Sequence, residues 1–326
     1  MTTGGAGSAL VSIVLPTYKR AHVLPWAIRS VLAQSYTHWE LIVVDDNSPD
    51  DTAAVVASFT DPRIRYVKNE PNLKLPRALN RGFSMAQGEF LTWTSDDNLY
   101  APTAIEKMVA RLQAGGCDLV YADYYLFSTQ GADGRPSDPQ HNRLPATEQL
   151  HKGNHIGACF LYTRQVYDAV GDYDPELFLV EDYDYFIRIA RLFTLGHIAE
   201  PLYYFRRDED TLYLSRFAEV KASDLLVRHR NGLLDDKGLL DAMVAIILRK
   251  SDGLKPMLLR WAYRGFEGHS WRLSQWQQRF AASFLRRRLI TDVSALLQAA
   301  RAGAAPFQDT RNALAELMKR YGRIEY

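Results

Sequence analysis

Cysteine is scarce in this sequence, with only Cys117 and Cys159 among 326 residues. The two lie far apart and form neither a CxxC motif nor a metal-ligand spacing. A disulfide framework and a cysteine-based zinc site are therefore not expected. We predict that both are small core residues of a protein in a reducing compartment.

Long apolar runs and an excess of one charge are also missing. No segment approaches the roughly 20 apolar residues that span a bilayer. Residues 1–9, MTTGGAGSA, lack the basic and apolar regions of a signal peptide, and we expect a flexible tail there. Lys and Arg number 39 against 38 Asp and Glu, which gives a net charge of +1 and argues against a dedicated nucleic-acid-binding protein. We therefore expect a cytoplasmic location, with contact at the inner face of the membrane left open.

The sequence does contain a regular alternation of apolar, β-rich segments and segments with helical spacing. Strands are predicted at 10–16, 40–46, 63–69, 88–94 and 117–127. Helices are predicted between them at 23–34, 48–59, 75–87 and 101–114. Continuous apolar strands separated by helices predict an α/β fold with a mostly parallel sheet covered on both faces.

The second part of the sequence is less regular. Residues 128–145 are rich in Gly, Pro, Asp and Ser and predict a surface loop or lid. Three further structured segments follow before about residue 215, where the pattern becomes wholly helical. We therefore divide the chain into a tail, two halves of one α/β domain and a helical C-terminal region, with bounds 1–9, 10–100, 101–214 and 215–326.

Acidic pairs follow two of the predicted strands: Asp45 and Asp46 end the second, and Asp96 and Asp97 the fourth. Ligands of such sheets bind at the carboxyl ends of the strands. Adjacent carboxylates suit Mg²⁺ or Mn²⁺, which would share a substrate diphosphate. The alternative is a solvated turn in which Asp97 or Asn98 caps the next helix.

Other polar residues at these strand ends suit a nucleotide. Asp46 could accept hydrogen bonds from a base or ribose, whereas Ser48 is interpreted as the N-cap of the following helix, with Asp50 and Asp51 in its first turn. Tyr18 could stack on a base, and Arg20 could face a phosphate. Lys74 and Arg77 suit a diphosphate, although any one of these cations could equally be a solvated surface charge.

The stretch FLVEDYDYFIR places Glu181, Asp182 and Asp184 among large apolar residues. Desolvation raises the pKa of a carboxylate and makes it a better general base. The alternative is structural: Asp184 and Arg188 form a helical i,i+4 pair, while Glu181 and Asp182 start the helix. Both interpretations can hold for different residues.

Four ordered segments carry a resemblance: VSIVLPTYKR, QSYTHWELIVVDDNSPDDT, ALNRGFSMAQGEFLTWTSDDNLYAP and VEDYDYFIRIAR. Together they resemble the inverting family 2 glycosyltransferases of GT-A (Rossmann-like) fold. TSDDNLYAP with VVDDNS is especially similar to the bacterial spore-coat polysaccharide member. The resemblance covers roughly residues 10 to 210, and four motifs in order are far more specific than any one of them.

The resemblance implies a nucleotide-sugar donor, with UDP favoured, at the strand ends. Pro16, Thr17 and Tyr18 would lie on the base and ribose side, and Asp46 would read the base edge. Asp96 would contact the ribose or the metal, and Asp97 would ligate Mn²⁺ or Mg²⁺.

The same resemblance places Lys74 on the nucleotide side and gives Arg77 weaker support. Asp182 matches the general base, which takes the proton of an acceptor hydroxyl during a single displacement with inversion. The acceptor would be a glycan or a lipid-linked sugar, and Glu181 is a candidate contact to phosphate or acceptor.

Two departures from the family pattern stand out. Thr94 replaces the first acid of the usual Asp-x-Asp-Asp motif, as in the spore-coat relative. The family's Arg-x-His is also absent, since Arg206 is followed by Arg207 and Asp208. Either the two arginines contact the phosphates or this loop serves another purpose.

The C-terminal region matches no recognised motif. Its expected role is packing or formation of a homodimer. The sharper alternative is peripheral membrane docking through Arg286–Arg288 beside Phe284 and Leu285.

Three other functions fit the sequence less well. A sugar nucleotidyltransferase and a dinucleotide oxidoreductase both need a glycine-rich loop after the first strand, and LPTYKR has no glycine. A catalytically inactive nucleotide-sugar-binding protein is disfavoured by the presence of Asp97 and Asp182.

Overall fold

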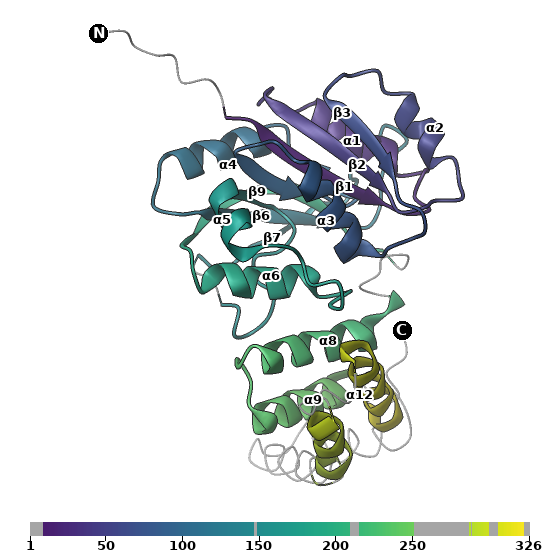
Figure 1. The fold of residues 1–326 in the computed structure, drawn as a ribbon, viewed down its shortest axis with the longest axis vertical. Coiled ribbons are helices and arrows are strands. Elements are labelled where there is room, and N and C mark those ends of the chain that lie inside the picture. The colour runs from purple at the N-terminus through teal and green to yellow at the C-terminus, as the bar shows by residue number, and fades with distance from the viewer. Residues whose placement is uncertain are drawn as a thin grey trace, which may run out of the picture. The chain divides into compact units, whose positions relative to one another are not determined.

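The computed structural model describes residues 9–146, 149–208, 215–250, 287, 289–299 and 306–322. The chain divides into two compact units, Met1–Thr211 and Leu212–Tyr326 (Figure 1). The first unit contains the mixed α/β structure that positions the candidate site, and the second is helical where it is described.

The first half of the α/β unit follows the predicted alternation closely. Its strands β1, β2 and β4 are almost wholly buried, as continuous apolar runs between two helical layers require. Pro25 lies in the first turn of α1, where its missing N–H costs no hydrogen bond. The elements are β1 (Val11–Thr17), α1 (Leu24–Leu32), β2 (Trp39–Asp45), α2 (Thr52–Ala57), β3 (Ile64–Lys68), α3 (Leu75–Met85), β4 (Phe90–Trp93) and β5 (Leu99–Tyr100).

The second half supplies further strands and helices. Its long strands β6 and β9 run side by side, with shifts in register after Ala122 and Asp123. The elements are α4 (Ala104–Gln113), β6 (Leu119–Phe127), β7 (Gln140–Asn142), β8 (Phe160–Thr163), α5 (Arg164–Val170), α6 (Glu181–Ala190) and β9 (Leu195–Arg206).

The nine strands described form one sheet, in the order β3-β2-β1-β4-β8-β6-β9-β5, with β7 paired to β6. The first four strands along the chain are parallel, as predicted. The sheet as a whole is mixed, because β8 is antiparallel to both β4 and β6 and β5 is antiparallel to β9. The sequence does not predict this, because a buried strand has the same apolar pattern whichever way it runs.

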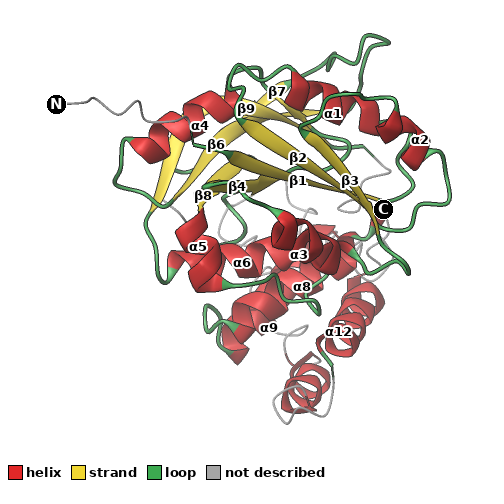
Figure 2. Ribbon diagram, turned by 45° about the horizontal axis from the view of Figure 1, so that its top comes forward, coloured by secondary structure: helices red, strands yellow, loops and turns green. Residues whose placement is uncertain are grey.

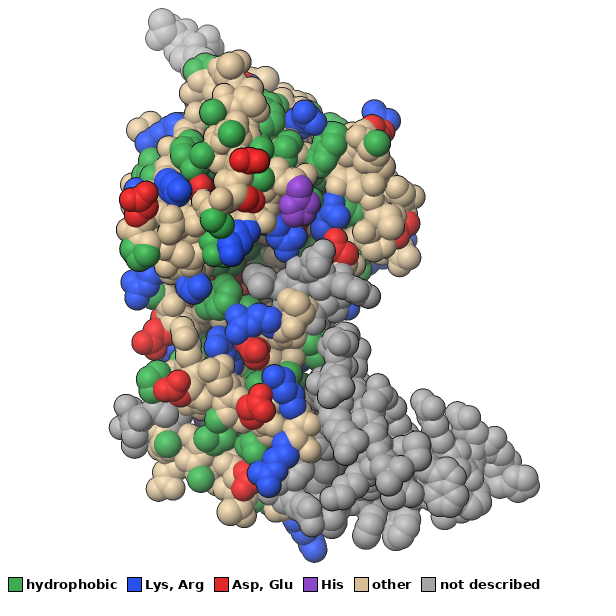
Figure 3. All heavy atoms as spheres, turned by 90° about the vertical axis from the view of Figure 1, so that its right-hand side faces the viewer, with side chains coloured by type: hydrophobic (Ala, Val, Ile, Leu, Met, Phe, Trp, Pro, Cys, Tyr) green, Lys and Arg blue, Asp and Glu red, His purple; other side chains and the backbone are tan. Residues whose placement is uncertain are grey.

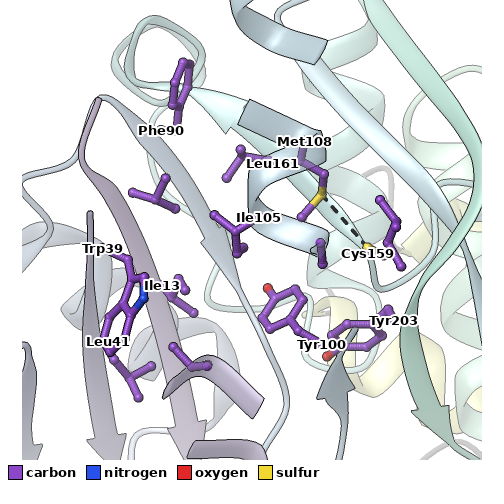
Figure 4. Packing of buried hydrophobic residues seen from close by; sticks show 14 of the residues in the cluster. Ile13, Trp39, Leu41, Phe90, Tyr100, Ile105, Met108, Cys159, Leu161 and Tyr203 are labelled. Atoms are coloured by element: carbon purple, nitrogen blue, oxygen red, sulfur yellow. Dashed lines mark hydrogen bonds between the residues drawn. The ribbon is translucent and has the colours of Figure 1, made fainter. Parts of the chain in front are cut away.

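Helices cover both faces of the sheet: α1, α2 and α4 lie on one side and α3, α5 and α6 on the other (Figure 2). α3 packs closely on β1 and β2, where a Cβ on Gly82 would lie 2.4 Å from Cγ1 of Val14. The opposite layer contains the large core that includes Ile105 and Met108 of α4 and Trp39 and Leu41 of β2 (Figure 4). This packing fixes the strand ends that carry the acidic pairs.

Both cysteines are free and buried, which confirms their prediction as core residues. Sγ of Cys159 lies 3.9 Å from the sulfur of Met108, where the segment before β8 meets α4 (Figure 4). Burial raises the pKa of both thiols, so neither is poised to act as a nucleophile.

The prediction that Ser48 caps the second helix is wrong. α2 begins at Thr52 with Asp51 as its N-cap, and the Asp51 side chain makes no capping hydrogen bond, so Asp50 and Asp51 both precede the first turn in which they were predicted. Ser48 instead joins two strand ends, because its N–H donates to Oδ1 of Asp45 (2.7 Å) and its hydroxyl accepts from the N–H of Lys19 (3.0 Å). Ser48 therefore serves the tight turn after β2, not the start of the helix.

Residues 128–145 are more ordered than the predicted surface loop. They contain strand β7 and an isolated bridge between Gln130 and Pro136. Asp123 of β6 ties β7 and β9 together, accepting from Nε2 of His141 (2.8 Å), Nε2 of His197 (2.8 Å) and the N–H of Leu144 (2.9 Å).

The C-terminal unit contains α8 (Phe217–Arg230), α9 (Asp236–Lys250), a helical stretch at 289–299 and α12 (Phe307–Gly322). They share a core of apolar side chains that includes Leu225, Met243 and Leu314. Among the helices described, none is long and apolar enough to cross a membrane.

The basic stretch proposed for membrane docking lies almost wholly outside the described residues. Only Arg287 of Phe284–Arg288 is described, and it is exposed. On the face shown in Figure 3, basic and acidic side chains are interspersed, in keeping with the balanced composition. The membrane contact and the dimer therefore stay predictions.

Candidate functional site

Asp96 and Asp97 occupy the turn between β4 and β5. Asp96 is buried and Asp97 half-buried. The alternative in which Asp97 or Asn98 caps the next helix is wrong, since the N-cap of α4 is Thr103. Asn98 instead accepts a hydrogen bond from the N–H of Arg206, at the end of β9, through Oδ1 (2.8 Å).

The negative charge of this pair is only partly compensated by the protein. Burial and the neighbouring charge of Asp97 raise the pKa of Asp96 to about 7, against the opposing effects of Thr17 and Arg20. Burial also raises the pKa of Asp97, while Arg20 and Arg206 lower it. A buried pair whose ionised form remains destabilised beside two guanidinium groups is suited to bind a cation together with an anionic ligand.

The end of β9 brings Arg206 to this turn. Its Nε donates to the backbone oxygen of Asp97 (3.4 Å), and Nη1 forms an ion pair with Asp208 (3.2 Å). Arg207 is exposed, and its N–H donates to the backbone oxygen of Phe127 (2.8 Å), which ties the end of β9 to the end of β6. Of the two predicted arginines, Arg206 therefore lies at the acidic turn, and a contact of Arg207 with phosphate stays a prediction.

Asp46 follows β2 and organises the loop before α3. Its Oδ1 accepts from Nδ2 of Asn69 and from the N–H of Leu73, and its Oδ2 from the N–H of Lys74, all at 2.8 Å. Lys74 has a φ of +71°, which a non-glycine residue rarely adopts. Asp46 thus holds this backbone in place, and its predicted contact with a base edge stays a prediction.

The other nucleotide-side candidates lie at the end of β1 and the start of α3. Pro16 and Thr17 are buried at the end of β1, and the backbone oxygen of Thr17 accepts from the N–H of Asp46 (2.9 Å). Tyr18 is 42% exposed, so part of its ring is available for stacking. Lys74 and Arg77 are exposed at the start of α3.

The second acidic pair lies in the first turn of α6. Glu181 is buried, and its Oε2 accepts from the N–H of Leu179 (2.9 Å). Burial and the charge of Asp182 raise the pKa of Glu181 to about 8. Asp182 is half-buried, and burial raises its pKa as well.

Asp182 is oriented by two neutral donors. The N–H of Tyr183 donates to Oδ1 (2.7 Å) and Nδ2 of Asn154 donates to Oδ2 (2.8 Å). Both bonds favour the ionised form and partly oppose the effect of burial. The result is a carboxylate of fixed orientation and increased basicity, which is what a general base requires.

Asp184 and Arg188 form the predicted structural pair. Nε of Arg188 lies 2.8 Å from Oδ2 of Asp184, one turn along α6. Arg188 also donates to the backbone oxygens of Val170 and Asp172 (both 2.9 Å). This arginine therefore ties α6 to the end of α5. Asp184 has a structural role, and Glu181 and Asp182 stay the candidates for a functional role.

Two polar residues at the site were not found from the sequence, Asn154 and Gln130, and Asn98 was considered only as a helix cap. Asn154 lies 28 positions before Asp182, and Gln130 lies 76 positions before Arg206, to which it is hydrogen-bonded. Isolated amide side chains have no periodicity or charge pattern that would distinguish them from ordinary loop residues. Their contacts arise only when the strands assemble.

A divalent cation fits the acidic turn by its chemistry, because Asp96 and Asp97 offer the carboxylate oxygens that Mg²⁺ and Mn²⁺ prefer. Within the described residues, no group of three or more His, Cys, Asp and Glu side chains could hold a metal ion. Two carboxylates are enough where substrate phosphates and water complete the coordination. Asp97 and Asp96 are therefore the residues that would hold such an ion.

Comparison with known proteins shows which family and which fold this chain resembles. Residues 12–171 match the family model described as Glycosyl transferase family 2. The chain is 32% identical over 186 residues to WcaA of Escherichia coli K12, a putative colanic acid biosynthesis glycosyl transferase, covering 56% of this chain and 66% of that protein. The chain spans between 36% and 66% of the length of this and two other curated relatives.

Two solved structures have a similar fold. TarS of S. aureus (residues 1–349), in complex with UDP, gives a TM-score of 0.54 at 16% identity, covering 97% of this chain and 92% of that one. The mannosyltransferase PcManGT of Pyrobaculum calidifontis, in complex with GDP-Man and Mn²⁺, gives a TM-score of 0.52 at 16% identity, covering 98% of this chain and 89% of that one. These likenesses confirm the predicted GT-A fold, whereas the likeness to the spore-coat member stays a prediction. Residues 12–171, just under half of the chain, therefore carry its similarity to glycosyltransferase family 2.

Proposed function

We propose that this protein transfers a sugar from a nucleoside-diphosphate sugar to an acceptor hydroxyl, in the synthesis of a polysaccharide, glycolipid or other glycan. The observation that carries the proposal is the pair of acidic sites. One lies at the end of a parallel strand beside Arg20 and Arg206, and the other at the start of α6. The match of residues 12–171 to glycosyltransferase family 2 supports the same reaction class.

On the donor side, Asp97 and Asp96 would hold Mn²⁺ or Mg²⁺. A bound divalent cation would stabilise the negative charge that develops on the departing diphosphate. Arg20 and Arg206 add positive charge beside the acids, and Lys74 is an exposed cation at the start of α3. Tyr18 offers an exposed ring for the base.

UDP is the nucleotide we favour. Asp46 and the likeness of VVDDNS to the spore-coat member suit a pyrimidine, and TarS is in complex with UDP. PcManGT, in complex with GDP-Man, has a similar TM-score, so the fold alone does not select the base. The choice rests on residues at the strand ends.

On the acceptor side, Asp182 would act as general base. The acceptor hydroxyl oxygen attacks the anomeric carbon as the bond from that carbon to the diphosphate oxygen breaks. The hydroxyl proton passes to the carboxylate of Asp182, and the nucleoside diphosphate leaves. A single displacement of this kind inverts the anomeric configuration. Glu181 lies beside Asp182, but its carboxyl is buried and bonded to Leu179, so its role is to support the turn.

A panel of UDP-, GDP- and dTDP-sugars tests the proposal, with release of the nucleoside diphosphate measured in Mn²⁺ and in EDTA. We expect Mn²⁺-dependent release from one nucleotide class. Tight binding of UDP with Mn²⁺ but no turnover with any donor or acceptor would favour the catalytically inactive binding protein. Release that is equal in EDTA would contradict the metal assignment.

A further inference from the structure

Residues 128–138 form a small hairpin that follows β6. Gln130 and Pro136 make an antiparallel bridge, and the N–H of Gly131 donates to the backbone oxygen of Arg135 (2.9 Å). The carboxylate of Asp138 closes the base, accepting from the hydroxyls of Ser128 and Thr129 (both 2.9 Å). The hairpin therefore has a defined conformation of its own, although most of its residues are exposed.

Gly134 fixes the tip of this hairpin on α1. It is buried and has a φ of +81°, and a Cβ placed on it would lie 2.0 Å from Cε3 of Trp26. Neither the conformation nor the contact leaves room for a side chain. The backbone of the tip thus rests directly against the indole, which also has the guanidinium of Arg29 over its ring at 4.7 Å.

One side chain connects the docked tip to the acidic turn. Nε2 of Gln130 donates to the backbone oxygen of Gly134, and its Oε1 accepts from Nη2 of Arg206. Both ends of this amide are thus engaged, one by the hairpin and one by the guanidinium. Arg206 in turn contacts the backbone oxygen of Asp97 and packs over the ring of Phe127 at 5.1 Å.

We propose that Gln130 is a positioning residue for Arg206, and that docking of hairpin 128–138 on Trp26 holds that guanidinium at the acidic turn. The inference rests on the proposed function, in which Arg206 faces the donor diphosphate. A long arginine side chain has many rotamers, and fixing it before the ligand arrives lowers the entropy lost on binding. Loss of either Gln130 or the docked tip should therefore weaken binding of an anionic ligand there.

Two variants and a matched control test this. Gln130→Ala removes the side-chain amide. Gly134→Ala keeps that amide but forces the tip of the hairpin away from Trp26. Gly131→Ala is the control, because its Cβ would crowd only Oδ1 of the exposed Asp133, at 2.9 Å, and would not meet Trp26. Binding of UDP in the presence of Mn²⁺ is measured by calorimetry, and hydrogen exchange of a peptide covering 203–208 is measured without ligand.

We expect Gln130→Ala and Gly134→Ala each to weaken UDP binding about fivefold to tenfold, and Gly131→Ala to change it less than about twofold. The double variant should lose no more than the stronger single variant, because both changes release the same side chain. The proposal would be overturned if the loss of UDP affinity in the double variant equalled the product of the two single losses, or if Gln130→Ala bound UDP as the parent does.

The hydrogen-exchange arm separates failure of this inference from failure of the proposed function. If the parent protein binds no UDP, the proposed donor site is wrong, and exchange still decides the positioning role. We expect faster exchange at 203–208 in Gln130→Ala and Gly134→Ala than in Gly131→Ala. Equal exchange in all three variants would overturn the inference by itself.

Discussion

The two acidic pairs of this domain are alike in sequence but differ in what surrounds them. Asp96 and Asp97 follow a strand and have Arg20 and Arg206 beside them. Glu181 and Asp182 start a helix, and the bonds to Asp182 come from the neutral donors Asn154 and Tyr183. Burial raises the pKa of carboxylates in both pairs.

This difference indicates a division of roles. Cations beside a buried acidic pair create a site where a metal ion and a diphosphate can be bound together. Neutral donors orient a carboxylate and leave it able to take up a proton. We therefore expect the same two-residue acidic motif to serve binding in one place and proton transfer in the other.

Replacing Asp182 should have the largest effect on rate. In Asp182→Asn the side chain keeps its shape but cannot accept the acceptor proton, so we expect kcat to fall about 10²- to 10⁴-fold. Initial rates of sugar transfer, at saturating donor, measure this. A loss of less than about threefold would show that Asp182 is not the general base.

Replacing Asp96 should stabilise the free protein. Its pKa of about 7 in the folded state lies above the ordinary 3.8, so the folded state holds the proton more tightly than the unfolded state. The free energy of unfolding must therefore fall as pH rises from about 4 to 7. Asp96→Asn has no carboxyl group to ionise and so avoids this loss of stability. We expect its free energy of unfolding to exceed that of the parent by on the order of 1–4 kcal/mol at about pH 8, and by almost nothing at about pH 4.

Urea unfolding of the parent and Asp96→Asn at the two pH values measures this gain without added metal. A gain that is equal at both pH values would show that the ionised carboxylate is not destabilised in the folded protein. Saturating Mn²⁺ should narrow the difference at the higher pH, because the ion stabilises the parent's carboxylate.

A smaller effect is expected at Asn154. Its hydrogen bond favours the ionised form of Asp182, so Asn154→Ala should raise the pKa of that carboxyl further. The acidic limb of the pH–rate profile would then move to higher pH, and kcat at neutral pH should fall about tenfold. A fall in kcat with an unmoved limb would assign Asn154 a purely structural role.

The smallest effects concern the exposed cations of α3. Lys74 is held at the start of the helix by the bonds from its loop to Asp46, whereas Arg77 lies further along the helix. We expect Lys74→Ala to weaken UDP binding about fivefold and Arg77→Ala to change it less than about twofold. Equal losses of UDP affinity in the two variants would show that the hydrogen bonds to Asp46 do not give Lys74 a larger part in binding than Arg77.

The parallel half of the fold was predictable because its strands and helices are encoded locally. β1, β2 and β4 are largely apolar runs, and the helices α1 to α4 that alternate with the strands have regular apolar spacing. The antiparallel direction of β8 could not be predicted, since burial on both faces leaves the same pattern in either direction. The turn after β2 was misassigned because Ser48 is favoured both as a helix cap and as a turn residue.

The candidate site was predictable where charge is concentrated. Paired acids among apolar residues, as at Asp96–Asp97 and Glu181–Asp182, are costly to bury and so draw attention to a function. Gln130 and Asn154 carry no charge and lie in loops far along the chain from Arg206 and Asp182. Only the folded structure brings Asn154 to Asp182 and Gln130 to Arg206.

The division of roles is tested most directly by the affinity for UDP with and without Mn²⁺, measured in the parent, Asp97→Ala and Asp182→Asn. We expect Mn²⁺ to tighten UDP binding to the parent and to Asp182→Asn alike, and Asp97→Ala to lose that tightening, a change of about 100-fold. Mn²⁺-dependent binding that survives in Asp97→Ala, or that disappears in Asp182→Asn, would contradict the account.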